Sequence, residues 1–109
     1  MHLNQSQTII EKFEISVQKL DKYCSDFWKR ENVMWNQMKD LGLNVRPESE
    51  QTMNKYGNQR IFKNENSRNE KFSYHFNMPN AHRAYLKAIT DDKKIFIANI
   101  VPHLDTVTG

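Results

Sequence analysis

Side chains that can move protons or hold an anion gather in the second half of this 109-residue chain. The prominent ones are His75, His82, Arg83, Tyr85, Lys87 and His103. Histidine exchanges protons near neutral pH, arginine stabilises negative charge on phosphate, and tyrosine or lysine can assist either step. Such a set suffices for phosphodiester chemistry without a metal, because one group can accept a 2′-hydroxyl proton while another protonates the leaving oxygen. We therefore predict Arg83, His103 and His82 as catalytic residues.

A plain structural role is the alternative for each of these residues. Arg83, Tyr85 and Lys87 alternate with apolar residues and would form the solvated face of an amphipathic strand. His103 would then only cap a turn. For any one residue taken alone, this structural role is the favoured interpretation.

Several other chemistries lack their motifs. The three glycines stand too far apart for a phosphate-binding loop, which disfavours nucleotide hydrolysis. Cys24 lies on an apolar helical stripe, where a buried and inert thiol is expected rather than a nucleophile. The histidines lack metal-ligand spacing, so we expect no metal and no cofactor.

Basic residues are concentrated in one part of the chain. The formal net charge is only +3, but residues 55–87 carry seven basic side chains and two acidic ones. This local excess is typical of an anion-facing surface, although a solvated sheet face has the same composition. The predicted nucleic-acid contacts are Arg60, Lys63, Lys71, His75, Tyr85 and Lys87.

Length and composition predict a single domain over residues 1–109. Hydrophobic residues make up 38% of the chain and charged residues 27%, which is enough apolar material for a core. No window approaches the roughly 20 apolar residues of a membrane span, and the N-terminus lacks a secretory pattern. We therefore expect a cytoplasmic protein that does not bind a membrane.

Residues 1–43 are predicted to be helical. Apolar residues recur at steps of three and four between Ser6 and Leu41, as on one side of a helix. A helix of this length exceeds a compact domain, so it either breaks near Lys29–Asn32 and forms a helical hairpin or presents its stripe to a second subunit. The lack of Gly or Pro at that point favours a homodimer. The predicted partner or dimer interface contains Phe13, Leu20, Phe27, Trp28 and Trp35.

The remainder of the chain is predicted to be a connection followed by a sheet. Residues 44–58 are polar and read as a connection with about one helical turn. From residue 59 the pattern changes to short alternating runs: Gln59–Lys63, Lys71–Phe76, Arg83–Ile89 and Lys94–Val101. The last run is apolar on both faces, which predicts a central strand. The expected fold class is α+β, with a long or broken amphipathic helix packed on a three- or four-stranded antiparallel sheet.

The order of these elements resembles the small toxins of the RelE/ParE superfamily. The resemblance covers about residues 59–106 and includes an Arg-Ala-Tyr strand at Arg83, an Asp-Asp-Lys-Lys-Ile-Phe-Ile hairpin at Asp91 and a Pro-His-Leu-Asp-Thr segment at Pro102. It implies two helices on an antiparallel sheet, cleavage of mRNA on the ribosome, and inhibition by a cognate antitoxin. In that family Arg83 would match a phosphate-contacting arginine, and His103 would match a His or Tyr near the C-terminal strand. The initial strand of that family is missing here, and its members are usually more basic.

Two hypotheses follow from the sequence. The first is a RelE-like endoribonuclease toxin whose partners are RNA or the ribosome and an antitoxin. The second is a non-catalytic interaction protein, such as a phage- or plasmid-encoded inhibitor or adaptor, which would use the helical stripe and the basic sheet to bind a partner protein or nucleic acid.

Overall fold

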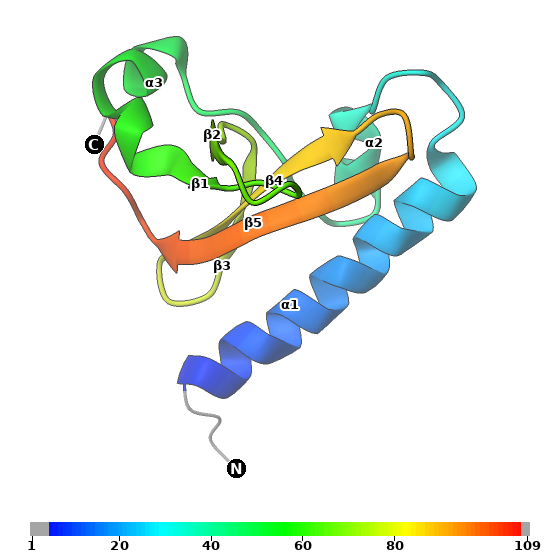
Figure 1. Cartoon of the computed structure of the whole chain (residues 1–109). Helices are drawn as coiled ribbons and strands as arrows, with labels where there is room; N and C mark the ends of the chain where they lie inside the picture. The colour runs from blue at the N-terminus through cyan, green and yellow to red at the C-terminus, as the bar shows by residue number, and fades with distance from the viewer. Residues whose placement is uncertain (1–4, 108–109) are drawn as a thin grey trace.

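The protein has an α+β fold in which helices precede two small antiparallel sheets. A computed structural model describes residues 5–107 (Figure 1). The helical elements are α1 (Gln5–Lys22) with a wider π turn (Tyr23–Phe27), α2 (Trp35–Asp40), and α3 (Glu50–Tyr56) with a 3-10 turn (Gly57–Arg60). The strands are β1 (Ile61–Lys63), β2 (Asn69–Lys71), β3 (His75–Met78), β4 (His82–Ile89) and β5 (Lys94–Pro102).

The N-terminal helical region is broken rather than continuous. Helix α1 and its π turn end at Phe27, and α2 begins at Trp35. The side chains of Tyr23 and Trp28 turn into the core, where they are 0% and 4% exposed. The Tyr23 hydroxyl accepts a hydrogen bond of 2.7 Å from the backbone N–H of Met34, which closes the loop between the helices. The break includes the region near Lys29–Asn32, where a break is one of the two predicted alternatives. The favoured alternative, one continuous helix, is wrong, because the helix ends at Phe27 and Trp28 packs in the core.

The larger sheet has the strand order β3-β4-β5, with antiparallel pairing throughout. The prediction that the last strand is central is therefore wrong, since β5 lies at an edge. Its two apolar faces have a different explanation. Ile95, Ile97 and Ile100 pack with the helices, whereas Phe96 contacts Phe72 at a ring distance of 6.4 Å on the other face.

Strand phase in β4 agrees with the alternation in the sequence. Ala84 and Leu86 belong to the hydrophobic core shared with α1, and Tyr85 points to the other face against Phe62. A bulge follows Tyr85, where the partner on β5 changes from Asn99 to Ile97. The alternation therefore assigns residues to the correct faces although the pairing is irregular.

The predicted strand Lys71–Phe76 belongs to two different sheets. Strand β2 ends at Lys71 and pairs with β1, whereas β3 starts at His75 and pairs with β4. Phe72 lies between them with 2% exposure, and its N–H donates to the carbonyl of Arg60. Burial of this ring separates the two strands.

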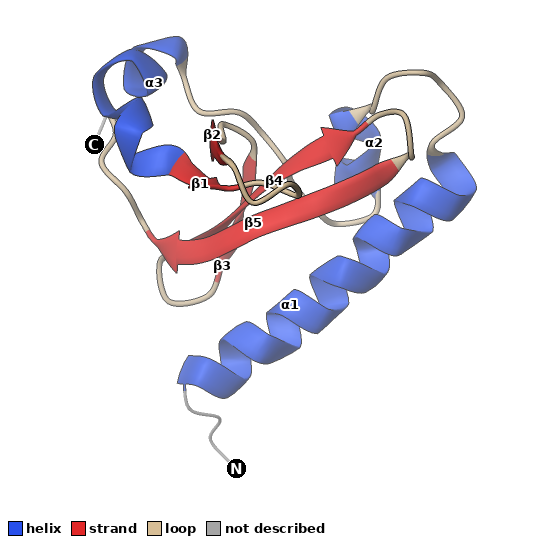
Figure 2. Ribbon diagram, viewed as in Figure 1, coloured by secondary structure: helices blue, strands red, loops and turns tan. Residues whose placement is uncertain are grey.

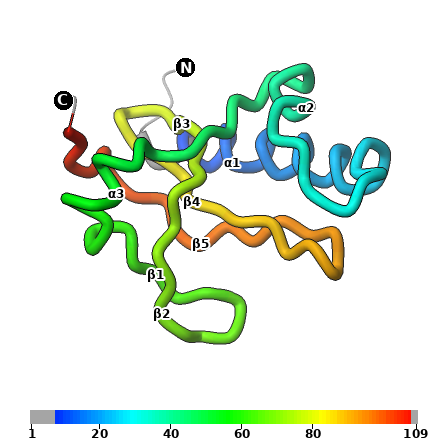
Figure 3. The backbone as a smooth tube through the Cα atoms, turned by 90° about the horizontal axis from the view of Figure 1, so that it is seen from above, coloured from blue at the N-terminus to red at the C-terminus, as the bar shows by residue number. Residues whose placement is uncertain are grey.

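The larger sheet lies between two layers. Helix α1 runs along one face, and α3 with the β1–β2 hairpin lies on the other side (Figure 2). Viewed from above, the β1–β2 hairpin projects away from α1 and α2 (Figure 3). None of the helices in residues 5–107 is long and apolar enough to cross a membrane.

Helix α3 (Glu50–Tyr56) is longer than the single helical turn predicted for residues 44–58. The Ser49 side chain caps it by accepting a 3.1 Å hydrogen bond from the N–H of Thr52. Before the cap, Arg46 pairs with His75 through two backbone hydrogen bonds of 3.1 and 3.0 Å. This pairing fixes the segment that precedes α3 along the outer edge of β3.

Candidate functional site

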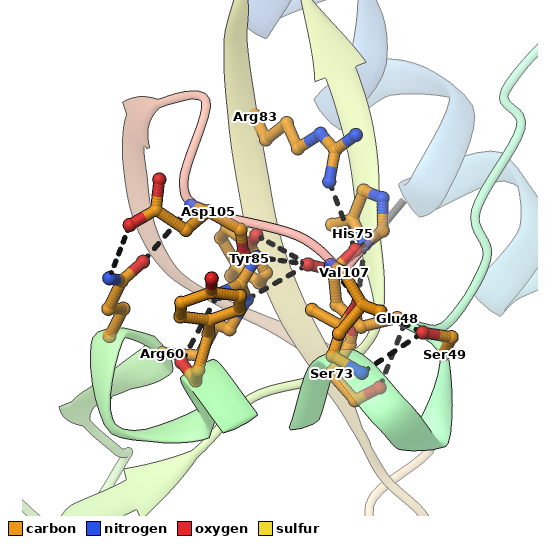
Figure 4. A network of polar contacts seen from close by, with 12 residues as sticks. Glu48, Ser49, Arg60, Ser73, His75, Arg83, Tyr85, Asp105 and Val107 are labelled. Atoms are coloured by element: carbon orange, nitrogen blue, oxygen red, sulfur yellow. Dashed lines mark hydrogen bonds and ion pairs between the residues drawn. The ribbon is translucent and has the colours of Figure 1, made fainter. Parts of the chain in front are cut away.

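A buried carboxylate lies at the centre of the polar residues. Glu48 follows the Arg46 bridge, and its N–H donates to both the carbonyl and the hydroxyl of Ser73 at 3.1 and 3.0 Å. These bonds direct its side chain under the sheet, where it is 4% exposed (Figure 4). A buried ionised carboxylate requires compensating partners, and four side chains supply them.

Arg60 is the principal partner of Glu48. Its Nε and Nη2 both donate to Oε2 of Glu48, the first at 2.9 Å. Two further donors of the guanidinium reach the carbonyls of Tyr56 and Asp105 at 3.2 and 2.7 Å. Arg60 is 0% exposed, so its predicted contact with nucleic acid is wrong. Its guanidinium forms hydrogen bonds inside the protein instead.

Arg83 binds the other oxygen of the same carboxylate. Its Nη1 lies 3.0 Å from Oε1 of Glu48, and its side chain is 13% exposed. Because an arginine has five N–H donors in a fixed plane, one contact with Glu48 leaves donors for an anion. Glu48 thus orients Arg83, and Arg83 also lines the cleft described below.

Tyr85 and His75 complete the surroundings of Glu48. The Tyr85 hydroxyl lies 3.4 Å from Oε2 of Glu48 and is buried, and burial followed by the charge of Glu48 raises its pKa. The His75 ring packs on Tyr85 at 5.4 Å, and its Nδ1 lies 3.1 Å from the Ser73 carbonyl and 3.4 Å from Oε1 of Glu48. Tyr85 is 0% exposed, so its predicted contact with nucleic acid is wrong. His75 is 2% exposed and lines the cleft described below.

The protonation of His75 follows from these contacts. Burial lowers the pKa of His75, and the charges of Arg83 and Arg46 act in the same direction, whereas Ser73 and Glu48 oppose them. Because a carbonyl can only accept, Nδ1 carries the proton of the neutral ring, and Nε2 keeps its lone pair. Within residues 5–107, Nε2 has no hydrogen-bond partner. The contacts therefore provide a neutral imidazole whose Nε2 can accept a proton.

A cleft of about 270 Å³ lies over this network. Its lining includes Arg46, Glu48, His75, Arg83, His103 and Thr106. His103 follows β5, and its N–H donates 2.8 Å to the carbonyl of Ala81, which holds the exposed imidazole beside the start of β4. The structure therefore brings together Arg83, His75 and His103, which are distant in sequence.

His82 is not part of this cleft. It lies two positions before Ala84 and shares its strand phase, and its Nδ1 is bonded at 2.9 Å to the carbonyl of Asn80. Successive residues of a strand point to opposite faces, and Arg83 points to the face with the cleft. His82 points to the opposite face, so its predicted catalytic role is wrong.

The predicted lysines lie elsewhere. Lys87 forms ion pairs of 2.6 and 2.9 Å with Glu65 and Glu70, and the hydrogen bond that Lys87 donates to Glu65 is the largest cause that raises the pKa of Lys87. Lys63 and Lys71 are exposed on the β1–β2 hairpin and do not line the cleft. The predicted basic surface is therefore not continuous. The charge of Lys87 is compensated by Glu65 and Glu70, and Lys63 and Lys71 lie outside the cleft that contains the histidines.

Most of the predicted partner interface is core. Leu20 and Trp28 are each 4% exposed, and Phe13 and Trp35 pack against the same cluster. For Leu20 and Trp28 the interface prediction is wrong because these side chains are buried in the core of the same chain, whereas Phe13 and Trp35 are only partly buried. Phe27 is 42% exposed.

Sequence reasoning missed Glu48 and Arg46. Both stand in a segment read as a solvated connection, where charged residues are expected to be exposed. The pattern Ser49 to Thr52, which marks the start of α3, is the one signal that this segment is ordered.

Comparison with protein-family models, curated proteins and solved structures gives no match. Kinship with the RelE/ParE toxins therefore stays a prediction.

Proposed function

We propose that this protein is a metal-independent endoribonuclease of the RelE-like toxin type. The observation that supports the proposal is the convergence of His75, Arg83 and His103 on one cleft above the buried Glu48. In the reaction, the 2′-oxygen of RNA attacks the adjacent phosphorus and the bond to the 5′-oxygen breaks. The products are a 2′,3′-cyclic phosphate and a 5′-hydroxyl.

Each residue has a distinct role in this proposal. His75 accepts the 2′-hydroxyl proton on Nε2, whose lone pair is free because the neutral ring carries its proton on Nδ1. Arg83 donates to the phosphate oxygens and stabilises the charge that develops on them. His103, the exposed imidazole of the cleft, protonates the leaving 5′-oxygen. Glu48 and Arg60 are positioning residues, since Glu48 binds Arg83 and Arg60 fixes Glu48.

The biological setting of the proposal comes from the resemblance to RelE/ParE toxins. It comprises mRNA or the ribosome as target, an antitoxin that covers the cleft, and a cytoplasmic location. A non-catalytic inhibitor or adaptor is the second candidate. Exposed Ile10 and Ile15 on α1 favour it, because apolar side chains remain there after the rest of the stripe is covered.

The test is cleavage of end-labelled single-stranded RNA in excess EDTA. We expect products that end in a 2′,3′-cyclic phosphate and no cleavage of the same sequence made with 2′-O-methyl groups. Arg83→Ala and His103→Ala should each lower the rate by about 100-fold or more. Arg68→Ala, which removes an arginine from the exposed β1–β2 turn, is the matched control and should cleave at the wild-type rate.

Two outcomes would contradict the proposal. If all variants cleave as fast as the wild type, the activity belongs to a contaminant. If the wild type does not cleave RNA but binds a partner protein through α1, the adaptor candidate is favoured.

A further inference from the structure

A second cleft adjoins the one that contains the histidines. It has a volume of about 410 Å³ and is also lined by Arg46 and Pro47, so the two hollows share a wall. Trp35 and Tyr74 line the second cleft, and their rings are stacked at 5.0 Å with an interplanar angle of 25°. None of the residues assigned to the reaction, Arg83, His75 and His103, lines this second hollow.

The aromatic pair is held in a fixed position. Trp35 is the first residue of α2, and the carbonyl of Tyr74 accepts a 3.1 Å hydrogen bond from the N–H of Leu86 on β4. Both rings pack against the hydrophobic core on one side. Both are also only partly buried, so aromatic surface remains in contact with the hollow. A rigid and partly exposed ring loses little conformational entropy when it binds a flat ligand.

The polar residues around this pair favour an anionic ligand. Lys39 and Arg46 are exposed and line the hollow, and none of its described lining residues is acidic. Asn36 and Asn44 are exposed on the same lining and carry amides that can both donate and accept hydrogen bonds. Aromatic surface, cations and amides are the three groups that bind a nucleotide with an unpaired base.

We propose that Trp35 and Tyr74 form a base-stacking subsite for the nucleotide next to the scissile phosphate of a single-stranded RNA. This inference rests on the proposed function. When Arg83 binds the scissile phosphate, the next phosphate along the RNA strand reaches Arg46, which lines both clefts. The base of that next nucleotide then lies on the rings of Trp35 and Tyr74. A base in a duplex already has both faces stacked, so the subsite selects single strands.

The first test uses an oligonucleotide that cannot be cleaved by 2′-hydroxyl attack. A fluorescein-labelled 2′-O-methyl RNA is titrated with protein and followed by fluorescence anisotropy. An oligomer of the same length with abasic residues is the second probe. We expect Trp35→Ala to weaken binding of the 2′-O-methyl RNA by about 5- to 100-fold, the range for one stacked base, and to leave the abasic oligomer unaffected.

Two variants control this test. Trp35→Phe keeps an aromatic face and should retain most of the affinity. Phe27→Ala removes an aromatic side chain that is 42% exposed outside both clefts, and it should bind both probes as the wild type does. If Trp35→Ala binds both probes like the wild type, or if wild-type protein prefers duplex RNA, the subsite is overturned.

A measurement on the wild-type protein covers the case in which Trp35→Ala fails to fold. The chain has two tryptophans, and Trp28 is 4% exposed, so a stacked base should quench the fluorescence of Trp35 selectively. We expect quenching by the 2′-O-methyl RNA and none by the abasic oligomer. Equal effects of the two probes would overturn the inference.

The results for the two proposals are separable. Cleavage that depends on Arg83 and His103, with binding that does not depend on Trp35, retains the endoribonuclease and removes the subsite. Binding that depends on Trp35 without any cleavage retains the subsite and removes the endoribonuclease.

Discussion

Nη1 of Arg83 lies 3.0 Å from Oε1 of Glu48, although 35 positions separate the two residues in the chain. Glu48 precedes α3 and Arg83 belongs to β4, so this contact joins the helical connection to the central strand. It also determines which way the guanidinium points. The side chain most suited to hold a phosphate is therefore oriented by a carboxylate that is itself buried.

Glu48→Gln should destabilise the protein strongly. The substitution keeps the shape of the side chain and removes the charge that compensates Arg60, which is 0% exposed. Loss of one partner of a buried ion pair costs about 3–5 kcal/mol in free energy of unfolding, which urea denaturation measures. Glu31→Gln makes the same chemical change at an exposed loop position and should leave the unfolding midpoint unchanged. Equal midpoints for the two variants would contradict the structural role of Glu48.

Because of His75, the free energy of unfolding should decrease as the pH falls below 6.5, the ordinary pKa of histidine. Burial lowers the pKa of His75 from 6.5 in the folded state. Between the lowered pKa and 6.5 the unfolded chain binds more protons than the folded one, so stability is present above pH 6.5 and is lost as the pH falls towards the folded pKa. His75→Asn, whose amide can replace the Nδ1 donor to Ser73, should show a shallower loss in urea denaturation between pH 7 and 5. The exposed His103→Asn is the control, and it should keep the wild-type slope.

Trp28 should tolerate Phe far better than Ala. The Nε1 of Trp28 is buried and has no hydrogen-bond partner in the described part of the chain. Trp28→Phe keeps an aromatic ring in the core and removes the unsatisfied donor. Removal of that donor stabilises the folded state and so partly offsets the packing that the smaller ring loses. Trp28→Ala leaves a cavity and should cost about 3–5 kcal/mol in thermal or urea unfolding. A Phe variant as unstable as the Ala variant would show that the donor has a partner in solution.

The protein should be a monomer in solution. Much of the apolar stripe of α1 packs inside the chain, with Leu20 4% exposed and Phe13 packed on the core, so the reason to expect a dimer is weakened. Light scattering at micromolar concentration should give a mass near 13.0 kDa that does not change on dilution. A mass near twice this value would indicate that exposed Ile10 and Ile15 form an interface between copies.

The sequence predicts the features that depend on periodicity. The α+β class and the two faces of β4 follow from the spacing of apolar residues, because burial of one face imposes that spacing. The break between the helices does not, since the length of the helical stretch leaves a break and a continuous helix open. Position within the sheet does not follow from it. Strand β5 is apolar on both faces because α1 covers one face and Phe72 the other, and not because strands flank it on both sides.

The site was only partly predictable for a different reason. Arg83 and His103 are visible as polar residues at a strand and just past one, and they share a cleft. The buried state of Glu48 and Arg60 is not visible, since composition predicts that charges are exposed. Their burial depends on a contact between segments that precede and follow α3, and a single sequence carries no record of such pairs.

During translation, the hydrogen bond from Arg60 to the carbonyl of Asp105 can form only late. The donor is synthesised 45 residues before the acceptor, and His103 and Thr106, which line the cleft, are also translated late. While these residues are still inside the ribosome, Glu48 and Arg60 can pair, but the cleft above them lacks a wall. A nascent chain therefore carries an incomplete cleft until Thr106 has emerged.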